Sequence, residues 1–514
     1  MTEAISIENS STTATSSAAS SFRGRTIAGL PRGVLLLSFT ELWERFSYYG
    51  MLAILVLYLS TSVQEGGFGW SDQSALKLYG LYSGLAFTLP LLGGWIANMF
   101  LGERRCILLG GVLITLGHGL IALPTLIPLL SHHMFGMDFA QLLRESGAPL
   151  GYVLGGEPLA MVRESAARAG VSPTVAMAAY LVTSGSFFGG LASIIAGTAL
   201  LKPTISSIVG RFYDDKDPRR DTGFAVFLVG IYFGVISGTL IVGLLGERAG
   251  WHLGFGAAGI GMTIGLIIYV SLQRRYLGDL GVKAEGRRTS GNVVASTAAE
   301  RDRIKCVLII TAFATIYAAV VFQFGGLFIL IAKTHVDRAR WGWEIPSSWF
   351  IAAMSITCIL ATPALAWLWE RLAARGHPVR TSLKLACGLI VAGIGYLVVA
   401  YPVITAADRD HYLMSPVWFL VMHVLFGLAE AVVWAGVISF TTRLAPKRFT
   451  AMFVGGTYLS MGVGTWLAGY IGALSYSFGV GTILVSVAIL SLSAGALLYA
   501  LRGRLARLTH GIEP

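Results

Sequence analysis

Three charged residues stand within a segment that is otherwise almost entirely apolar. Glu41, Glu44 and Arg45 lie in the run 34–59. If this run is a helix, the three share one face with Tyr48, because they are spaced at i, i+3, i+4 and i+7. Charges at membrane depth are costly, and they usually face a bundle interior or a water-filled path used by an ion or a substrate. A purely structural Glu41–Arg45 salt bridge is the alternative, but apolar packing stabilises a helix in lipid at lower cost.

A fourth charged side chain, Lys202, ends another apolar stretch and precedes Pro203. One interpretation is a lysine whose long side chain reaches the membrane interface. The other is an inward-facing partner for Glu41 and Glu44. We favour the partner, because an intramembrane lysine needs a counter-charge and this chain offers few. Pro203 is predicted to break the helix at this point and to free a backbone carbonyl.

Glu430 is an acidic residue in the middle of the apolar stretch 416–441. It has no basic neighbour in sequence, so it needs a proton, a remote lysine or a cationic ligand to remain buried. A permanently protonated packing residue is the alternative. His423 and Trp434 share its helical face. For His423 we expect a neutral, hydrogen-bonded helix histidine, since a charged imidazole is costly there.

The composition excludes a soluble protein and predicts an all-α protein of the membrane. Of 514 residues, 55% are hydrophobic and 13% are charged, with a mean hydropathy of +0.70. Ordinary soluble domains carry about a quarter of charged residues. Because a span needs about 20 apolar residues, we predict twelve: 33–61, 78–100, 106–129, 176–200, 222–246, 251–273, 305–332, 348–369, 383–403, 416–441, 450–474 and 478–501.

The distribution of basic residues predicts the orientation and the partners. The formal net charge is +11. Most Lys and Arg residues fall in the segments that are cytosolic if both termini are inside, which is the usual bias of a membrane protein. We therefore expect a multi-pass protein of the cell membrane, with the lipid bilayer and not a nucleic acid as its partner.

A long basic and polar stretch, 274–304, divides the twelve spans into two bundles of six, as in transporters built from repeated halves. The predicted organisation is a disordered cytosolic tail, a first bundle with a long outside loop, a cytosolic linker, a second bundle and a second tail. These segments are 1–32, 33–273 with the loop 130–175, 274–304, 305–501 and 502–514.

No enzyme, metal centre or disulfide framework is predicted. The four cysteines, at positions 106, 306, 358 and 387, lie in or at the ends of spans and have no metal-ligand spacing. The pair His132-His133 is too small a ligand set for a transition metal. Phosphate-binding loops and nucleophile elbows are absent from the sequence.

These features together resemble the proton-dependent oligopeptide transporter family of the major facilitator superfamily, over residues 37–469. The family pattern ExxERFxYYG is matched in full by Glu41, Glu44, Arg45, Phe46, Tyr48, Tyr49 and Gly50. The pattern GTGLLKP is similar to 197–203, with Ala199 in place of a glycine, and GRxYxxxDPRRD resembles 210–221. Glu430 matches the glutamate of a GE pair, and 444–446 match LAP.

The resemblance implies a major facilitator fold and proton-driven import of di- and tripeptides by alternating access. It assigns proton coupling to Glu41, Glu44, Arg45 and Lys202. No cofactor is implied other than protons, and a monomer is expected. A zwitterionic substrate would lie between a basic pole and an acidic pole. The implied substrate-binding residues are Arg45, Tyr48, Tyr49, Lys202, Tyr232, Phe322, Gln323, Glu430 and Trp434.

The chain departs from the family pattern at several pocket positions. Leu52 and Phe322 replace residues that form an ion pair across the outer gate, so we expect that gate to close by apolar packing and to depend little on pH. Amides that clamp the peptide backbone are replaced by Tyr232 and Met354. Asn98 replaces an aspartate, and Thr457 replaces a tryptophan. A non-peptide transporter, an exporter and a non-transporting ligand sensor therefore remain alternatives.

Overall fold

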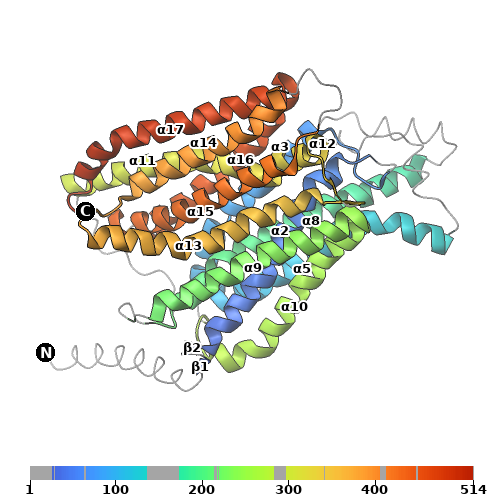
Figure 1. Cartoon of the computed structure of the whole chain (residues 1–514). Coiled ribbons are helices and arrows are strands. Elements are labelled where there is room, and N and C mark those ends of the chain that lie inside the picture. Colours follow the sequence, from blue (N-terminus) through green and yellow to red (C-terminus); the bar gives the residue numbers. More distant parts are fainter. Residues whose placement is uncertain are drawn as a thin grey trace.

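The computed structural model describes residues 26–27, 29–62, 65–135, 173–213, 217, 219–282, 297–340, 342–405, 413–446 and 450–512. Within them the fold is almost wholly helical (Figure 1). The α-helices are α2 (Arg32–Ser60), α3 (Asp72–Thr88), α4 (Pro90–Ile96), α5 (Glu103–Phe135), α8 (Pro173–Gly210), α9 (Arg219–Arg248), α10 (Trp251–Leu277), α11 (Ala298–Val321), α12 (Leu327–His335), α13 (Phe350–Ala374), α14 (Thr381–Thr405), α15 (Pro416–Leu444), α16 (Thr450–Phe478) and α17 (Val480–Leu508).

Short elements join or interrupt these helices. A π-helical turn, η2 (Ala97–Leu101), follows α4, and 3-10 turns form η4 (Phe322–Gly325) between α11 and α12 and η5 (Ser347–Trp349) before α13. Two antiparallel pairs complete the described structure: β1 (Thr26–Ile27) with β2 (Leu30–Pro31), and β3 (Ala339–Arg340) with β4 (Trp343–Glu344).

Hydropathy explains why the chain forms long, closely packed helices. Ten helical segments of the described residues are long and apolar enough to cross a membrane. Two more helices, α2 and α16, have 29 residues each and are also long enough to span. In lipid each backbone N–H must be paired within its own segment, which a helix achieves. The structure thus has the helical architecture of the predicted fold, while the count of twelve spans and the orientation stay predictions.

Glycines allow the helices of the first half to approach at backbone distance. Helix α5 packs against α8, and α2 packs against α9. A Cβ atom on Gly110 would lie 2.6 Å from the carbonyl oxygen of Gly197, and a Cβ on Gly197 would lie 2.6 Å from that of Gly110. Gly234 leaves room in the same way for the carbonyl oxygen of Leu42. Small residues at helix interfaces are the usual means of close packing in membranes.

A second glycine seam joins the two halves of the chain. Helix α3 of the first half packs against α16 of the second, and both lie side by side in Figure 1. Gly80 and Gly469 face each other, so that a Cβ on Gly469 would lie 2.5 Å from the Cα of Gly80. One turn further, Gly84 faces the carbonyl oxygen of Gly462. Helices α9 and α13 form another contact between the halves.

The structure corrects the prediction that Pro203 breaks its helix. Helix α8 continues through Pro203 to Gly210. Proline is tolerated within membrane helices when neighbours accommodate the freed carbonyl. That carbonyl belongs to Ala199, four residues earlier, and Gly93 of α4 lies directly against it with no room for a side chain. The predicted release of a carbonyl is compatible with this geometry, but the predicted end of the helix is wrong.

Several boundaries also differ from the predicted ones. The first pair of strands lies in the segment predicted as a disordered tail, and α2 begins directly after it. Helix α5 extends to Phe135 and α8 begins at Pro173, so both enter the predicted loop 130–175. Helices α10 and α11 likewise extend into 274–304. Residues 1–25, 136–172 and 283–296 lie outside the described residues.

We expect Gly469→Ala to destabilise the protein, because the added methyl group has no space against α3. Overpacking of this kind costs about 1–3 kcal/mol. Gly456→Ala is the matched control on the same helix, since its Cβ would have no neighbour within 4 Å. Thermal unfolding of the purified variants tests the prediction. Equal melting temperatures for Gly469→Ala and the wild type would contradict the close packing of Gly469 against α3.

Candidate functional site

The charged cluster predicted on the first span is buried on α2. Glu41, Glu44 and Arg45 are 3%, 0% and 3% exposed. The Nε atom of Arg45 lies 2.9 Å from Oε1 of Glu41 and 2.5 Å from Oε2 of Glu44. One guanidinium therefore pairs with two carboxylates, which leaves one negative charge to be balanced by another cation or a proton. Several of these polar atoms, including Arg45 Nη2 and Glu41 Oε2, have no hydrogen-bond partner among the described residues. The cluster thus retains polar atoms that can pair with a ligand.

Lys202 belongs to the same electrostatic environment but contacts an aromatic ring. Its side chain interacts electrostatically with Glu41, Glu44 and Arg45. Its Nζ atom lies 3.8 Å from the centroid of the Phe87 ring, which is a cation–π distance. Phe87 comes from α3 and had not been identified from sequence. The lysine is therefore held near the carboxylates without an ion pair to either of them within 4 Å.

Glu430 forms a second polar group, on α15. The Tyr317 hydroxyl donates a hydrogen bond of 3.2 Å to Glu430 Oε2. The rings of Tyr317 and Trp434 pack edge to face with centroids 5.9 Å apart. Close by, Cys358 Sγ donates to the Tyr232 hydroxyl at 3.0 Å. Glu430 interacts electrostatically with both members of that pair. Sequence reasoning identified Glu430, Tyr232 and Trp434 but missed Tyr317 and Cys358.

Tyr49 lies within electrostatic range of both polar groups. It interacts electrostatically with Arg45 and Glu44 on its own helix and with Glu430 on α15. Its ring contacts Tyr48 edge to face at 5.1 Å and stacks on Phe324 at 6.3 Å. The structure therefore brings the basic and acidic poles predicted from sequence to a shared aromatic region.

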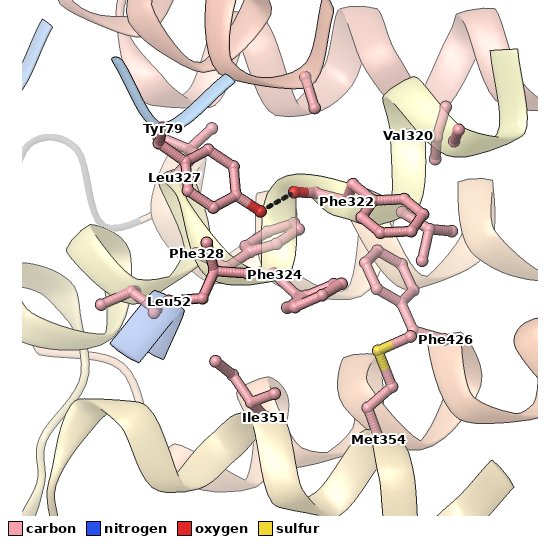
Figure 2. Packing of buried hydrophobic residues seen from close by; sticks show 14 of the residues in the cluster. Leu52, Tyr79, Val320, Phe322, Phe324, Leu327, Phe328, Ile351, Met354 and Phe426 are labelled. Atoms are coloured by element: carbon pink, nitrogen blue, oxygen red, sulfur yellow. Dashed lines mark hydrogen bonds between the residues drawn. The ribbon is translucent and has the colours of Figure 1, made fainter. Parts of the chain in front are cut away.

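The interruption between α11 and α12 closes one side of this region. The Tyr79 hydroxyl of α3 donates to the Phe322 carbonyl at 2.7 Å (Figure 2). The Phe322 ring contacts Phe87 edge to face at 5.3 Å. Gln323 donates from Nε2 to the Ala468 carbonyl of α16 at 2.8 Å. Its amide nitrogen therefore holds the helix interruption in place, although the resemblance implied a substrate contact.

The other residues that differ from the family pattern are buried among apolar side chains or lie in local structure. Leu52, Met354 and Phe322 are buried in one apolar cluster (Figure 2). Thr457 is hydrogen-bonded to Thr441 at 3.2 Å between their hydroxyls. Asn98 lies in η2. No group of three or more His, Cys, Asp or Glu residues able to hold a metal ion occurs among the described residues.

His423 is bound locally, as expected from its helical position. Its Nδ1–H faces the Phe419 carbonyl at 2.9 Å. Aromatic rings surround the imidazole, with Phe419 at 5.0 Å and Phe350 at 6.1 Å between centroids. This setting suits a neutral imidazole, because no carboxylate pairs with it within the described structure.

Comparisons with known proteins identify relatives along most of the chain. The family model described as PTR2, POT family, matches residues 104–279 and 278–485. The chain is 28% identical to the uncharacterized transporter YclF of Bacillus subtilis, covering 82% of this chain and 84% of YclF. It is 28% identical to a di-/tripeptide transporter of Lactococcus lactis, covering 85% and 88%. A crystal structure of a mutant peptide transporter POT in complex with alafosfalin superposes with a TM-score of 0.78 at 26% identity, over 97% and 99% of the two chains.

Proposed function

Since the chain belongs to the POT family, we propose that it imports di- and tripeptides or related zwitterionic peptide-like compounds, driven by protons through alternating access. It is a multi-pass protein of the cell membrane. The observation that supports the proposal best is a pair of charged poles on different halves of the chain, of which the first is buried and the second partly buried. Glu41, Glu44 and Arg45 lie on α2, and Glu430 lies on α15. Relatives described as peptide transporters support the substrate class.

Charge balance gives the basic pole a means of coupling proton binding to substrate binding. When Glu41, Glu44, Arg45 and Lys202 are all ionised, their charges cancel. A proton on one carboxylate leaves one positive charge unmatched, which is costly in a medium of low dielectric constant. A substrate carboxylate restores the balance. Proton binding and substrate binding therefore favour each other at this pole, and neither needs a cofactor.

The acidic pole gives a zwitterion its second anchor. Glu430 receives the substrate ammonium group, while Tyr317 orients the carboxylate through its hydroxyl. Because the two poles lie on opposite halves, a bound zwitterion draws the halves together. Tyr232, fixed by Cys358, and the apolar Met354 occupy positions where the family has backbone-binding amides. We therefore expect a narrow selectivity for short or modified substrates.

The alternatives differ in what the same poles accomplish. A transporter of a non-peptide zwitterion, or an exporter, would retain both poles but differ in ligand or direction. A ligand sensor would bind without moving protons, and the complete set of proton-linked residues on α2 and α8 argues against it. A thermal-shift screen with dipeptides, tripeptides and amino-acid derivatives distinguishes the ligand classes, because ligands stabilise the native state that binds them.

Proton coupling predicts that Glu44→Gln abolishes uptake driven by a pH gradient. Substrate exchange down its own gradient should continue, because substrate binding does not require proton release in an exchange cycle. Uptake and exchange by proteoliposomes measure the two activities. Glu370→Gln, an exposed change at the end of α13, is the matched control. Undiminished accumulation by Glu44→Gln would contradict the assignment of this carboxylate to proton coupling.

The acidic pole predicts that Glu430→Gln weakens ligands with a free amine far more than their N-acetylated analogues. A hydrogen bond to a charged group contributes about 1.5–3 kcal/mol, which corresponds to about ten- to hundred-fold in affinity. Competition binding to the purified protein measures both ligand classes. Equal losses for the two classes would show that Glu430 serves folding or proton transfer and not the amine.

Because Tyr232 and Met354 stand where the family has amide side chains, we predict that the wild type binds ordinary tripeptides poorly. The double variant Tyr232→Asn, Met354→Asn should widen acceptance, because it supplies two donors and acceptors for a peptide backbone. Competition by a panel of di- and tripeptides, for wild type and double variant, tests this. If the wild type already accepts most tripeptides with similar affinity, the prediction of a narrow selectivity is wrong. The substrate range is then that of a general peptide importer.

A further inference from the structure

A cavity lined by arginines lies between the start of α5 and the end of α10, and none of the residues that line it belongs to either pole. The two helices pack side by side (Figure 1). The cavity has a volume of about 490 Å³, and its charged lining residues are Arg104, Arg105, Arg274 and Asp279. Three cations and one anion leave a formal surplus of two positive charges. The cavity therefore favours an anionic occupant.

Arg104 is held in place by neutral acceptors. It donates from Nε and Nη2 to Gln273 Oε1 at 3.3 Å and 3.2 Å, and from Nη1 to the Gly278 carbonyl. Its backbone N–H donates to the Gly281 carbonyl at 2.9 Å. These bonds fix the turn after α10 against the start of α5. Because the acceptors carry no negative charge, the charge of Arg104 adds to the positive field of the cavity.

The other two arginines are exposed and available to a ligand. Arg105 belongs to α5 and Arg274 to α10, so each helix supplies one member of this exposed pair. Within the described part of the chain, neither forms an ion pair within 4 Å. A guanidinium group binds a phosphate group through parallel N–H donors, which makes arginine well suited to this kind of anion.

Each member of the exposed pair stands at the end of an exposed apolar stripe. On α5, Leu109 lies one turn after Arg105, and on α10, Val270 lies one turn before Arg274. Both stripes continue along the same helix faces through Val112 and Leu116 on α5 and through Ile264 and Ile267 on α10. In a membrane-spanning helix such exposed apolar residues meet the acyl chains of the lipid.

The two stripes run at the same depth on neighbouring helices. A Cβ on Gly111 of α5 would lie 2.8 Å from Cδ1 of Leu266 of α10, and a Cβ on Gly259 would lie 3.1 Å from the Cβ of His118. The helices are therefore antiparallel and in close contact. The exposed pair lies at the same end of both helices, about 10 Å beyond the Gly111 contact at 1.5 Å per residue.

We propose that this cavity binds the head group of an anionic phospholipid, with the acyl chains along the two apolar stripes. The phosphate oxygens accept hydrogen bonds from the exposed pair, one guanidinium from each helix, and so join α5 to α10. The predicted orientation places the cavity on the cytosolic side, where basic cavities between helices bind such head groups. A free phosphate ion would gain nothing from the stripes. The proposal depends on neither the substrate nor proton coupling.

Native mass spectrometry of the full chain tests the site. The protein is released from detergent in the presence of dioleoyl phosphatidylglycerol or dioleoyl phosphatidylcholine, two lipids with the same acyl chains and different net charge. We expect the wild type to retain phosphatidylglycerol with at least about tenfold higher affinity. Arg105→Gln with Arg274→Gln should weaken that lipid about thirty-fold, which is the effect of two basic residues at an anionic lipid surface.

The matched control is Arg502→Gln with Arg504→Gln, which removes the same charge from exposed residues near the end of α17. It should keep the wild-type affinity for phosphatidylglycerol. The single variants Arg105→Gln and Arg274→Gln should each give an intermediate loss, which keeps the test available if the double variant does not fold.

Equal affinity of the wild type for the two lipids would overturn the site. So would equal losses in the double variant and its control, because ordinary anchoring of arginines at the membrane surface would then explain the binding. Inorganic phosphate is added as a competitor: if it displaces phosphatidylglycerol at a similar concentration, the cavity binds a phosphate ion and the lipid assignment is wrong. None of these results touches the substrate assignment, which depends on the uptake and competition measurements.

Discussion

An ionised group within a membrane protein must meet a compensating charge or a proton. This constraint governs the centre of the molecule. On α2, one guanidinium lies between two carboxylates, and Lys202 supplies the fourth charge from α8. On α15, Glu430 has a hydroxyl partner but no cation within ion-pair distance among the described residues. Under the proposed function, a proton or a ligand cation completes this balance. The transported species would then be members of the charge balance, which would make their movement and the protein's stability interdependent.

The constraint also explains the surroundings of each charge. Aromatic rings cover the cluster without removing it from electrostatic contact: Phe87 lies against Lys202, and the Tyr48 ring lies 5.8 Å from the Arg45 guanidinium. Such rings pack as apolar groups and still offer a negative face to a cation. The glycines also place α3 and α16 at backbone distance, so part of the contact between the halves needs no side chains.

Sequence reasoning predicted the helical fold because hydropathy is a local property that can be read along the chain. It also predicted that Glu41, Glu44 and Arg45 meet, since they share one helix face. Contacts between segments that are far apart in the sequence were harder to predict. Phe87, Tyr317 and Cys358 have no local feature that separates them from ordinary core residues, and only the packing of α3, α11 and α13 brings them to the charges. Pro203 was misinterpreted for a related reason: its effect depends on Gly93 of a neighbouring helix. Gln323 was expected to face the ligand, whereas its amide nitrogen binds α16.

The interruption at η4 has a mechanical consequence. It cuts one long span into the 24 residues of α11 and the nine of α12. The short piece is about 13 Å long, and it is attached through Gly325 and Gly326, which both rest on the Tyr79 ring. A helix of nine residues is marginal by itself. The piece therefore depends on the burial of residues 327–332 and on two backbone hydrogen bonds near its far end, from the Met414 N–H to the His335 carbonyl at 2.7 Å and from the Asp337 N–H to the Met414 carbonyl at 2.9 Å, to keep its place beside α11.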